Sequence, residues 1–79
     1  MNSKEEVITR LKNISIKNIK QIQLRKIGLL DVFGKLIIDV SYLDDSKESI
    51  EIISPVPTDI ITNWLEINNL LNITTLYEF

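Results

Sequence analysis

The sequence predicts an α+β domain in the order helix, three-stranded antiparallel meander, helix, with a short fourth strand as an option at the C-terminus. Two segments with helical apolar spacing flank a pair of alternating, β-branched segments that are joined by turn residues. No repeat or linker divides the chain, so we expect one domain over residues 1–79. A chain of this length buries only about 60–65% of its unfolded surface, which predicts a thin core.

The first predicted helix begins at a capping-box pattern, Ser3-Lys4-Glu5-Glu6. In this pattern Ser3 accepts from the Glu6 amide while the Glu6 side chain reaches back to Ser3. Apolar residues then recur at helical spacing, namely Val7, Ile8, Leu11 and Ile14. The pattern predicts an amphipathic helix over residues 4–13.

The spacing after this helix is ambiguous, because apolar repeats of three and of two residues both occur. We predict a loop and then a strand from about Gln21, interrupted at Gly28 by a bulge or bend. Residues 29–33 are expected to continue that strand to a tight turn at Gly34-Lys35. The alternative is a second, basic helix over residues 16–27.

A hairpin is predicted for Leu36–Leu43 and Ser49–Ser54, since both segments alternate and residues 44–47 have turn chemistry. One face of this hairpin is apolar and consists of Ile38, Val40, Tyr42, Ile50 and Ile52. The opposite face contains Asp39, Ser41 and Glu51 but also Ile37 and Ile53. These last two isoleucines suggest a sheet covered on both faces, and we expect the two helices to lie on one or both of its faces.

The second helix is predicted to begin at Thr58 as N-cap, because Pro55 and Pro57 end the preceding strand. Asp59 is favourably placed in its first turn. A wide apolar face continues to about residue 70, through Ile60, Ile61, Trp64, Leu65, Ile67 and Leu71. Trp64 is expected to be a core anchor, and residues 73–79 are expected to form a short strand or a packed tail.

The composition excludes most catalytic and metal chemistry. The chain has no cysteine and no histidine, which removes thiol nucleophiles, imidazole bases and the common zinc sites. Gly28 and Gly34 are the only glycines, so there is no phosphate-binding loop or nucleophile elbow. The acidic residues around positions 44–48 lack the spacing of a calcium loop and are interpreted as a solvated turn. We therefore expect no enzyme activity, no catalytic residues, no cofactor and no bound metal.

The setting expected for the chain is the cytoplasm. Its N-terminus is charged and lacks the apolar stretch of a secretory signal, and no apolar run approaches the ~20 residues that span a bilayer. The absence of cysteine fits a reducing compartment. Abundant Ile, Asn and Lys with no Ala suggest an AT-rich genome, such as that of a bacterium, a phage or a mobile element.

The charge is sorted along the chain. Residues 1–35 contain eight of the nine Lys and Arg and three acids, which gives +5, whereas residues 36–79 contain Lys47 and eight acids, which gives −7. Such asymmetry indicates either a nucleic-acid surface or two halves that attract each other. The candidate nucleic-acid-binding residues are Arg10, Lys12, Lys17, Lys20, Arg25 and Lys26. A pI of about 5.0 and the lack of an aromatic residue before Phe33 favour internal pairing.

Two other features predict protein binding. Acidic residues around the hairpin turn would attract a basic partner, and two aromatic residues at the C-terminus would anchor a partner or a second copy. The candidate protein-binding residues are Asp44, Asp45, Glu48, Glu51, Tyr77 and Phe79. The alternative for the aromatic pair is that it closes the core of the domain itself.

Three functions follow from this sequence as hypotheses. The first is a small interaction protein of inhibitor, immunity or adaptor type that binds a protein partner. The second is a nucleic-acid-binding regulator that uses the basic segment, which requires those cations to share one open face. The third is a structural subunit that folds stably as a homodimer, suggested by the thin core.

Overall fold

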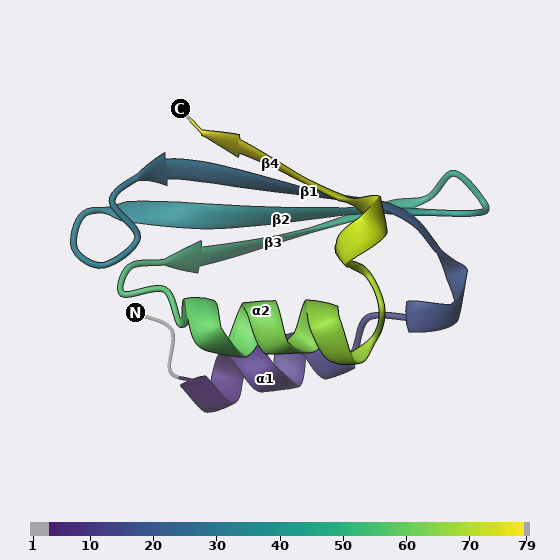
Figure 1. Cartoon of the computed structure of the whole chain (residues 1–79), viewed down its shortest axis with the longest axis horizontal. Helices are drawn as coiled ribbons and strands as arrows, with labels where there is room; N and C mark the ends of the chain where they lie inside the picture. Colours follow the sequence, from purple (N-terminus) through teal and green to yellow (C-terminus); the bar gives the residue numbers. More distant parts are fainter. Residues whose placement is uncertain (1–3, 79) are drawn as a thin grey trace.

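The computed structural model describes residues 4–78 and has the predicted α+β fold (Figure 1). Its elements, including two single-turn 3₁₀ helices labelled η, are α1 (Lys4–Lys12), η1 (Ile16–Asn18), β1 (Ile19–Gly28), β2 (Gly34–Tyr42), β3 (Lys47–Ile53), α2 (Thr58–Ile67), η2 (Leu71–Ile73) and β4 (Thr74–Glu78). The proposed capping serine, Ser3, lies outside the described residues.

The sheet has the strand order β3-β2-β1-β4. β2 pairs antiparallel with β1 and with β3, as the predicted meander requires. β4 adds to the other side of β1 in parallel, from the pair Ile22–Thr74 to the pair Lys26–Glu78. The predicted meander is therefore present, and the optional fourth strand forms as well. The sheet is four-stranded and mixed, because residues 74–78 return across the fold and pair with backbone groups that β1 would otherwise expose.

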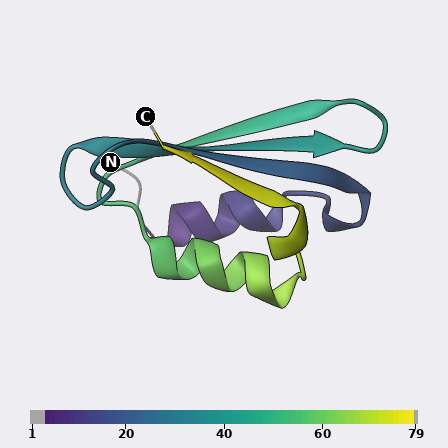
Figure 2. The same ribbon diagram turned by 45° about the horizontal axis from the view of Figure 1, so that its top comes forward.

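Both helices lie against the same face of the sheet (Figure 2). We call this the inner face and the opposite one the outer face. Of the two expected arrangements, helices on one face or on both faces of the sheet, the described residues have the first. The outer face carries charged side chains on adjacent strands, including Arg25, Asp39 and Glu51, and a covering helix would bury them at a high cost in desolvation.

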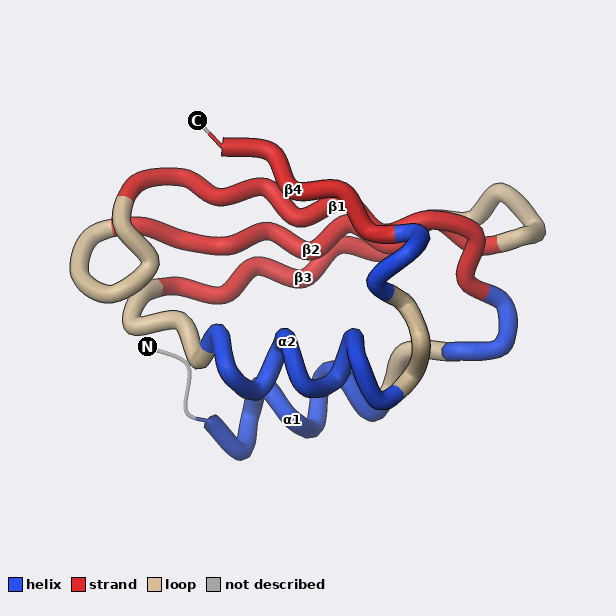
Figure 3. The backbone as a smooth tube through the Cα atoms, viewed as in Figure 1, coloured by secondary structure: helices blue, strands red, loops and turns tan. Residues whose placement is uncertain are grey.

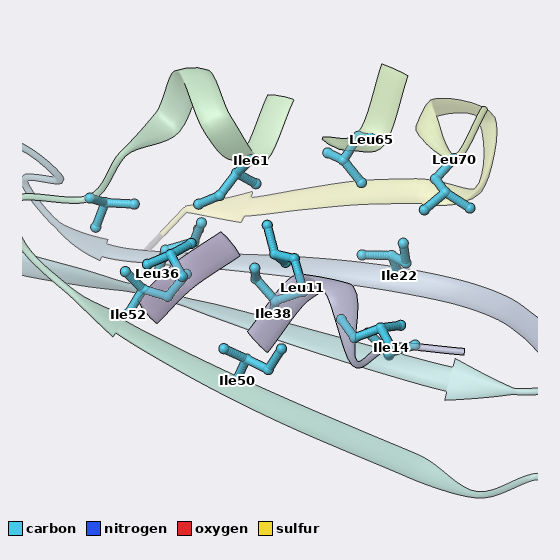
Figure 4. Close-up of a cluster of buried hydrophobic side chains, with 13 residues drawn as sticks. Leu11, Ile14, Ile22, Leu36, Ile38, Ile50, Ile52, Ile61, Leu65 and Leu70 are labelled. Carbon is cyan, nitrogen blue, oxygen red and sulfur yellow. The ribbon is translucent and has the colours of Figure 1, made fainter. Parts of the chain in front are cut away.

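The core lies between the inner face and the two helices (Figure 4). Val7 and Leu11 enter it from α1, and Ile61 and Leu65 enter it from α2. The sheet contributes alternate residues, as the predicted hairpin face requires, with Ile38 beside Ile50. The buried hydrophobic residues are Val7, Leu11, Ile14, Ile22, Leu36, Ile38, Val40, Ile50, Ile52, Val56, Ile61, Leu65 and Leu70.

The segment before β2 differs from the prediction. Residues 19–28 form a strand that begins two residues earlier than Gln21, so the alternative of a helix over 16–27 is wrong. Residues 29–33 do not continue the strand but form the loop between β1 and β2 (Figure 3). The tight turn predicted at Gly34-Lys35 is wrong, because both residues already pair with β1 as the first residues of β2. The left-handed backbone of Gly28, with φ +74°, turns the chain away from the ladder.

The second helix is shorter than predicted at its C-terminal end. Thr58 is the first helical residue rather than a cap, and Pro57 occupies the N-cap position. The helix stops at Ile67 because Asn69 has a left-handed φ of 57°, while Leu70 N–H donates to Leu65 O at 2.8 Å. This hydrogen bond and left-handed residue are the features of a Schellman motif, which also buries Leu70.

Candidate protein-interaction surfaces

The acidic turn after β2 is organised by its own hydrogen bonds. Asp44 accepts the backbone N–H of Ser46 at 3.0 Å and also its hydroxyl. The Ser46 side chain and backbone hold the pKa of Asp44 below its ordinary value. Asp45 has a left-handed φ of 70° and lies 3.9 Å from Lys20. Both aspartates thus shape the turn.

Glu48 and Glu51 point to opposite faces of β3. The Tyr42 hydroxyl donates to Glu48 at 3.3 Å. Burial is the larger cause, and the charge of Glu48 the next, of a pKa of Tyr42 above its ordinary value. Glu51 lies on the outer face, 3.7 Å from Lys35. The four acidic candidates therefore do not form one continuous acidic patch on the described part of the chain.

The two oppositely charged halves of the sequence meet in the fold. Four ion pairs between described residues each join a cation of residues 1–35 to an acid of residues 36–79. They are Lys20–Asp45 at 3.9 Å, Arg25–Asp39 at 2.7 Å, Lys26–Glu78 at 4.0 Å and Lys35–Glu51 at 3.7 Å. The charge sorting of the sequence therefore corresponds to attraction inside one domain.

The six basic candidates do not gather on one face. Arg10 and Lys12 belong to α1, and Lys17 lies in η1. Arg25 and Lys26 are adjacent in β1, so their side chains point to opposite faces of the sheet. The nucleic-acid hypothesis requires one shared open face, and these two residues do not meet that condition.

Asp39 is the centre of a polar network on the outer face. Its two carboxylate oxygens accept from Arg25 Nε at 2.7 Å and from Ser49 Oγ at 2.6 Å. Burial opposes the ionisation of Asp39, but the hydrogen bonds from Ser49 and Arg25 and the charges of Arg25 and Lys47 outweigh it. The pKa of Asp39 therefore lies below its ordinary value.

We expect Asp39→Asn to lower the free energy of unfolding by about 1 kcal/mol at pH 7, because it removes a charged hydrogen-bond acceptor. The folded pKa of Asp39 is depressed, so its contribution is present above the unfolded pKa and is lost as the pH falls through the folded pKa. Urea denaturation of both proteins should show a difference that shrinks below about pH 4. A difference that stays constant from pH 7 to pH 2.5 would contradict this role.

The loop between β1 and β2 exposes three large apolar side chains. In residues 29–33, which we call the apolar loop, Leu29 is 63%, Val32 is 55% and Phe33 is 84% exposed. Leu30 instead packs against the core. Clustered large apolar side chains on a surface mark interaction sites more often than scattered ones do.

The apolar loop is held in place by the backbone. Leu29 N–H donates to Phe33 O at 3.1 Å, and Val56 N–H donates to Leu30 O at 2.9 Å. Ser54 links the loop to the end of β3, since its hydroxyl bonds Val32 O and accepts the Gly34 N–H at 3.2 Å. The exposed side chains are therefore presented on an ordered loop.

A groove of about 350 Å³ runs between the two helices. Its lining includes Ile8 and Lys12 of α1 and Ile60, Trp64 and Ile67 of α2. Ile60 and Trp64 also pack against the core, which agrees with the predicted anchor role of Trp64. The groove therefore lies along the contact between the two helices.

The C-terminal candidates lie in β4 or beyond it. Tyr77 pairs with Arg25 on the outer face and is 41% exposed. Leu76, one residue earlier, is 55% exposed. Phe79 lies outside the described residues. Residues 74–78 form a strand, which was one of the two structures predicted for the tail, and its two large apolar side chains do not close the core.

Fold and surface together define a small α+β domain with a four-stranded mixed sheet, two helices on one face and an ordered apolar loop at one end. No family model, curated protein or solved structure matches this chain. Within residues 4–78, no helix is long and apolar enough to cross a bilayer. The same residues contain no group of three or more acidic side chains placed to hold a metal ion.

Sequence reasoning missed the apolar loop because its residues have strand-like composition. The sequence pattern predicts that Leu29, Val32 and Phe33 continue the strand that precedes them. Two signals could have located the loop. Gly28 and Gly34 bracket it, and Asp31 interrupts the apolar run at the position of a turn residue.

Proposed function

We propose that this chain is a non-enzymatic interaction protein, of inhibitor, immunity or adaptor type, which binds a protein partner through the apolar loop. The observation that carries this proposal is the exposure of Leu29, Val32 and Phe33 on a loop whose backbone is fixed by hydrogen bonds. An ordered loop loses little conformational entropy on binding, so burial of its side chains contributes more fully to affinity.

The partner that fits this loop is a protein with an apolar pocket. Burying one phenylalanine side chain contributes about 2–3 kcal/mol, which corresponds to the range of an interface hot spot. Asp31 lies in the middle of the loop, and a carboxylate there favours a protein pocket with a polar rim over insertion into lipid. The cytoplasm is the compartment in which we place this interaction.

Phe33→Ser is expected to weaken partner binding by at least 30-fold, because it removes the one aromatic side chain of the loop, which is 84% exposed. The tagged protein should be used to capture partners from the organism that encodes it, with and without nuclease. A protein that survives nuclease treatment is then purified and its dissociation constant is measured against both forms.

Ile67→Ser serves as the matched control, since Ile67 is 69% exposed but lies on α2. The affinity of the Ile67→Ser variant for the partner should equal that of the unchanged chain. Equal weakening by both substitutions would show that the loop has no special role. Recovery of nucleic acid alone, lost on nuclease treatment, would support the nucleic-acid hypothesis in its place.

A further inference from the structure

The two edges of the sheet differ in how they are protected. Tyr42 N–H donates to Ser46 O, and Ser54 N–H donates to Gly34 O. Hydrogen bonding alternates along an antiparallel ladder, so every second residue of β3 directs its backbone groups away from β2, toward the edge of the sheet. These residues are 47, 49, 51 and 53. Arg10 of α1 occupies that edge, since its guanidinium donates to Glu51 O at 3.3 Å.

The β3 edge has further features that discourage pairing with another strand. Lys47, Glu48 and Glu51 place three charges along its seven residues. Charged side chains and covered backbone groups are the means by which proteins protect sheet edges from association. The β3 edge is therefore protected against pairing with a second strand.

The β4 edge lacks these features. Thr74–Glu78 has one charged residue, at its last position, and two large side chains that are about half exposed, Leu76 and Tyr77. Among the described hydrogen bonds, no side chain reaches the outer edge of β4 as Arg10 reaches that of β3. An edge strand with exposed apolar residues is a template for strand addition.

We propose that β4 pairs antiparallel with β4 of a second copy about a two-fold axis at Leu76. This register pairs all five residues of β4 with all five of the partner strand. Each residue i lies opposite residue 152 − i, so Leu76 meets Leu76, Thr75 meets Tyr77, and Thr74 meets Glu78. The result is one continuous eight-stranded sheet.

Side-chain chemistry favours a second copy as the occupant of this edge. In the two-fold register Glu78 lies opposite Thr74, so no like charges meet across the axis. Leu76 lies on the inner face beside Leu24 and would gain an apolar neighbour. Tyr77 would pack on the Thr75 methyl group of the outer face, an aromatic and β-branched pair that stabilises sheets.

The contact is small, since five residues of strand edge bury well below the ~800 Å² per partner of a stable interface. The dimer should therefore dissociate on dilution. Analytical ultracentrifugation over a wide concentration range should show a monomer and a dimer in exchange. Leu76→Lys would place two cations opposite each other and should weaken the dimer at least tenfold.

Cysteine cross-linking tests the register itself, because the chain contains no cysteine. Directly opposed residues have Cα atoms about 4.5–5.5 Å apart, within the range of a disulfide. Leu76→Cys should therefore form a disulfide-linked dimer under mild oxidation. Thr75→Cys alone should not, whereas a mixture of Thr75→Cys and Tyr77→Cys chains should cross-link.

Leu43→Cys is the control for random collision, since Leu43 is 65% exposed and lies beside the β2–β3 turn. Equal cross-linking at positions 43 and 76, or a monomer at all concentrations, would overturn the proposal. So would a dimer that survives Leu76→Lys, or a strand of another protein found on β4 instead. Phe33→Ser should leave the cross-link unchanged, so this test is independent of the apolar loop.

Discussion

Ile38→Ala should lower the free energy of unfolding by about 3–4 kcal/mol. Ile38 is 0% exposed and lies on β2, between β1 and β3, in the same buried cluster as Leu11 of α1 (Figure 4). Alanine leaves a cavity in the layer that joins the sheet to the helices. In a domain of this size such a loss lowers the midpoint of thermal unfolding by about 12 °C or more.

Urea denaturation at pH 7 measures this effect, with Leu43→Ala as the control. Leu43 is exposed in the turn that follows β2, and its truncation should change stability by about 0.5 kcal/mol or less. A loss below about 1 kcal/mol for Ile38→Ala would show that β2 is not the centre of the core. A loss of similar size for Leu43→Ala would lead to the same conclusion.

Gly28→Ala and Gly34→Ala should each cost about 2–4 kcal/mol, because both add a Cβ where backbone already lies. At Gly28 the new atom would be 2.4 Å from Phe33 O, on a residue with φ +74°. At Gly34 it would be 2.4 Å from Ile27 O and 2.7 Å from Leu29 N. The apolar loop can close only if these two positions lack a side chain.

Urea denaturation and partner binding together test this requirement. Both glycine variants should weaken partner binding as well as stability, because the loop must adopt another path. Leu29→Ala is the control for stability, since this side chain is exposed and its backbone is unchanged. Glycine variants as stable as the unchanged chain would show that the loop tolerates a different closure.

The sequence predicted the parts of the fold that depend on local patterns. The two helices and the hairpin of β2 and β3 follow from apolar spacing and turn residues, and Ile38, Val40, Ile50 and Ile52 share the predicted face. The end of α2 was missed because Asn69, rather than glycine, adopts the left-handed conformation. Asparagine tolerates that conformation but marks it less clearly.

Features that depend on distant residues could not be predicted. The apolar loop is fixed by Ser54 and Val56, more than twenty residues away in the sequence, and no local pattern contains that information. The parallel pairing of β4 with β1 requires α2 to carry the chain back across the sheet. Residue patterns identified a short final strand as an option but could not give its partner.

For the candidate functional residues, too, the sequence predicted some features and missed others. The charge sorting was visible in the sequence, and the structure resolves it into ion pairs between the halves, such as Arg25–Asp39. The acidic turn is organised by Asp44 and Ser46. Tyr77 lies on an exposed edge strand, where its use in binding remains a prediction. The apolar loop was missed because a buried strand and an exposed apolar loop have the same composition.

Site-specific photo-cross-linking at position 33 tests the central claim most directly. Phe33 is replaced by a photoreactive phenylalanine analogue, which keeps an aromatic ring at the end of the apolar loop, directly before β2, and the chain is irradiated in the organism that encodes it. The control carries the same analogue at Leu43, which is exposed and belongs to the turn between β2 and β3. That turn lies at the opposite end of the sheet from the apolar loop (Figure 3). We predict that one protein is cross-linked to position 33 and that this product survives nuclease treatment. The same product should be absent when the analogue is at position 43. The same products from both positions, or none from position 33, would contradict the account.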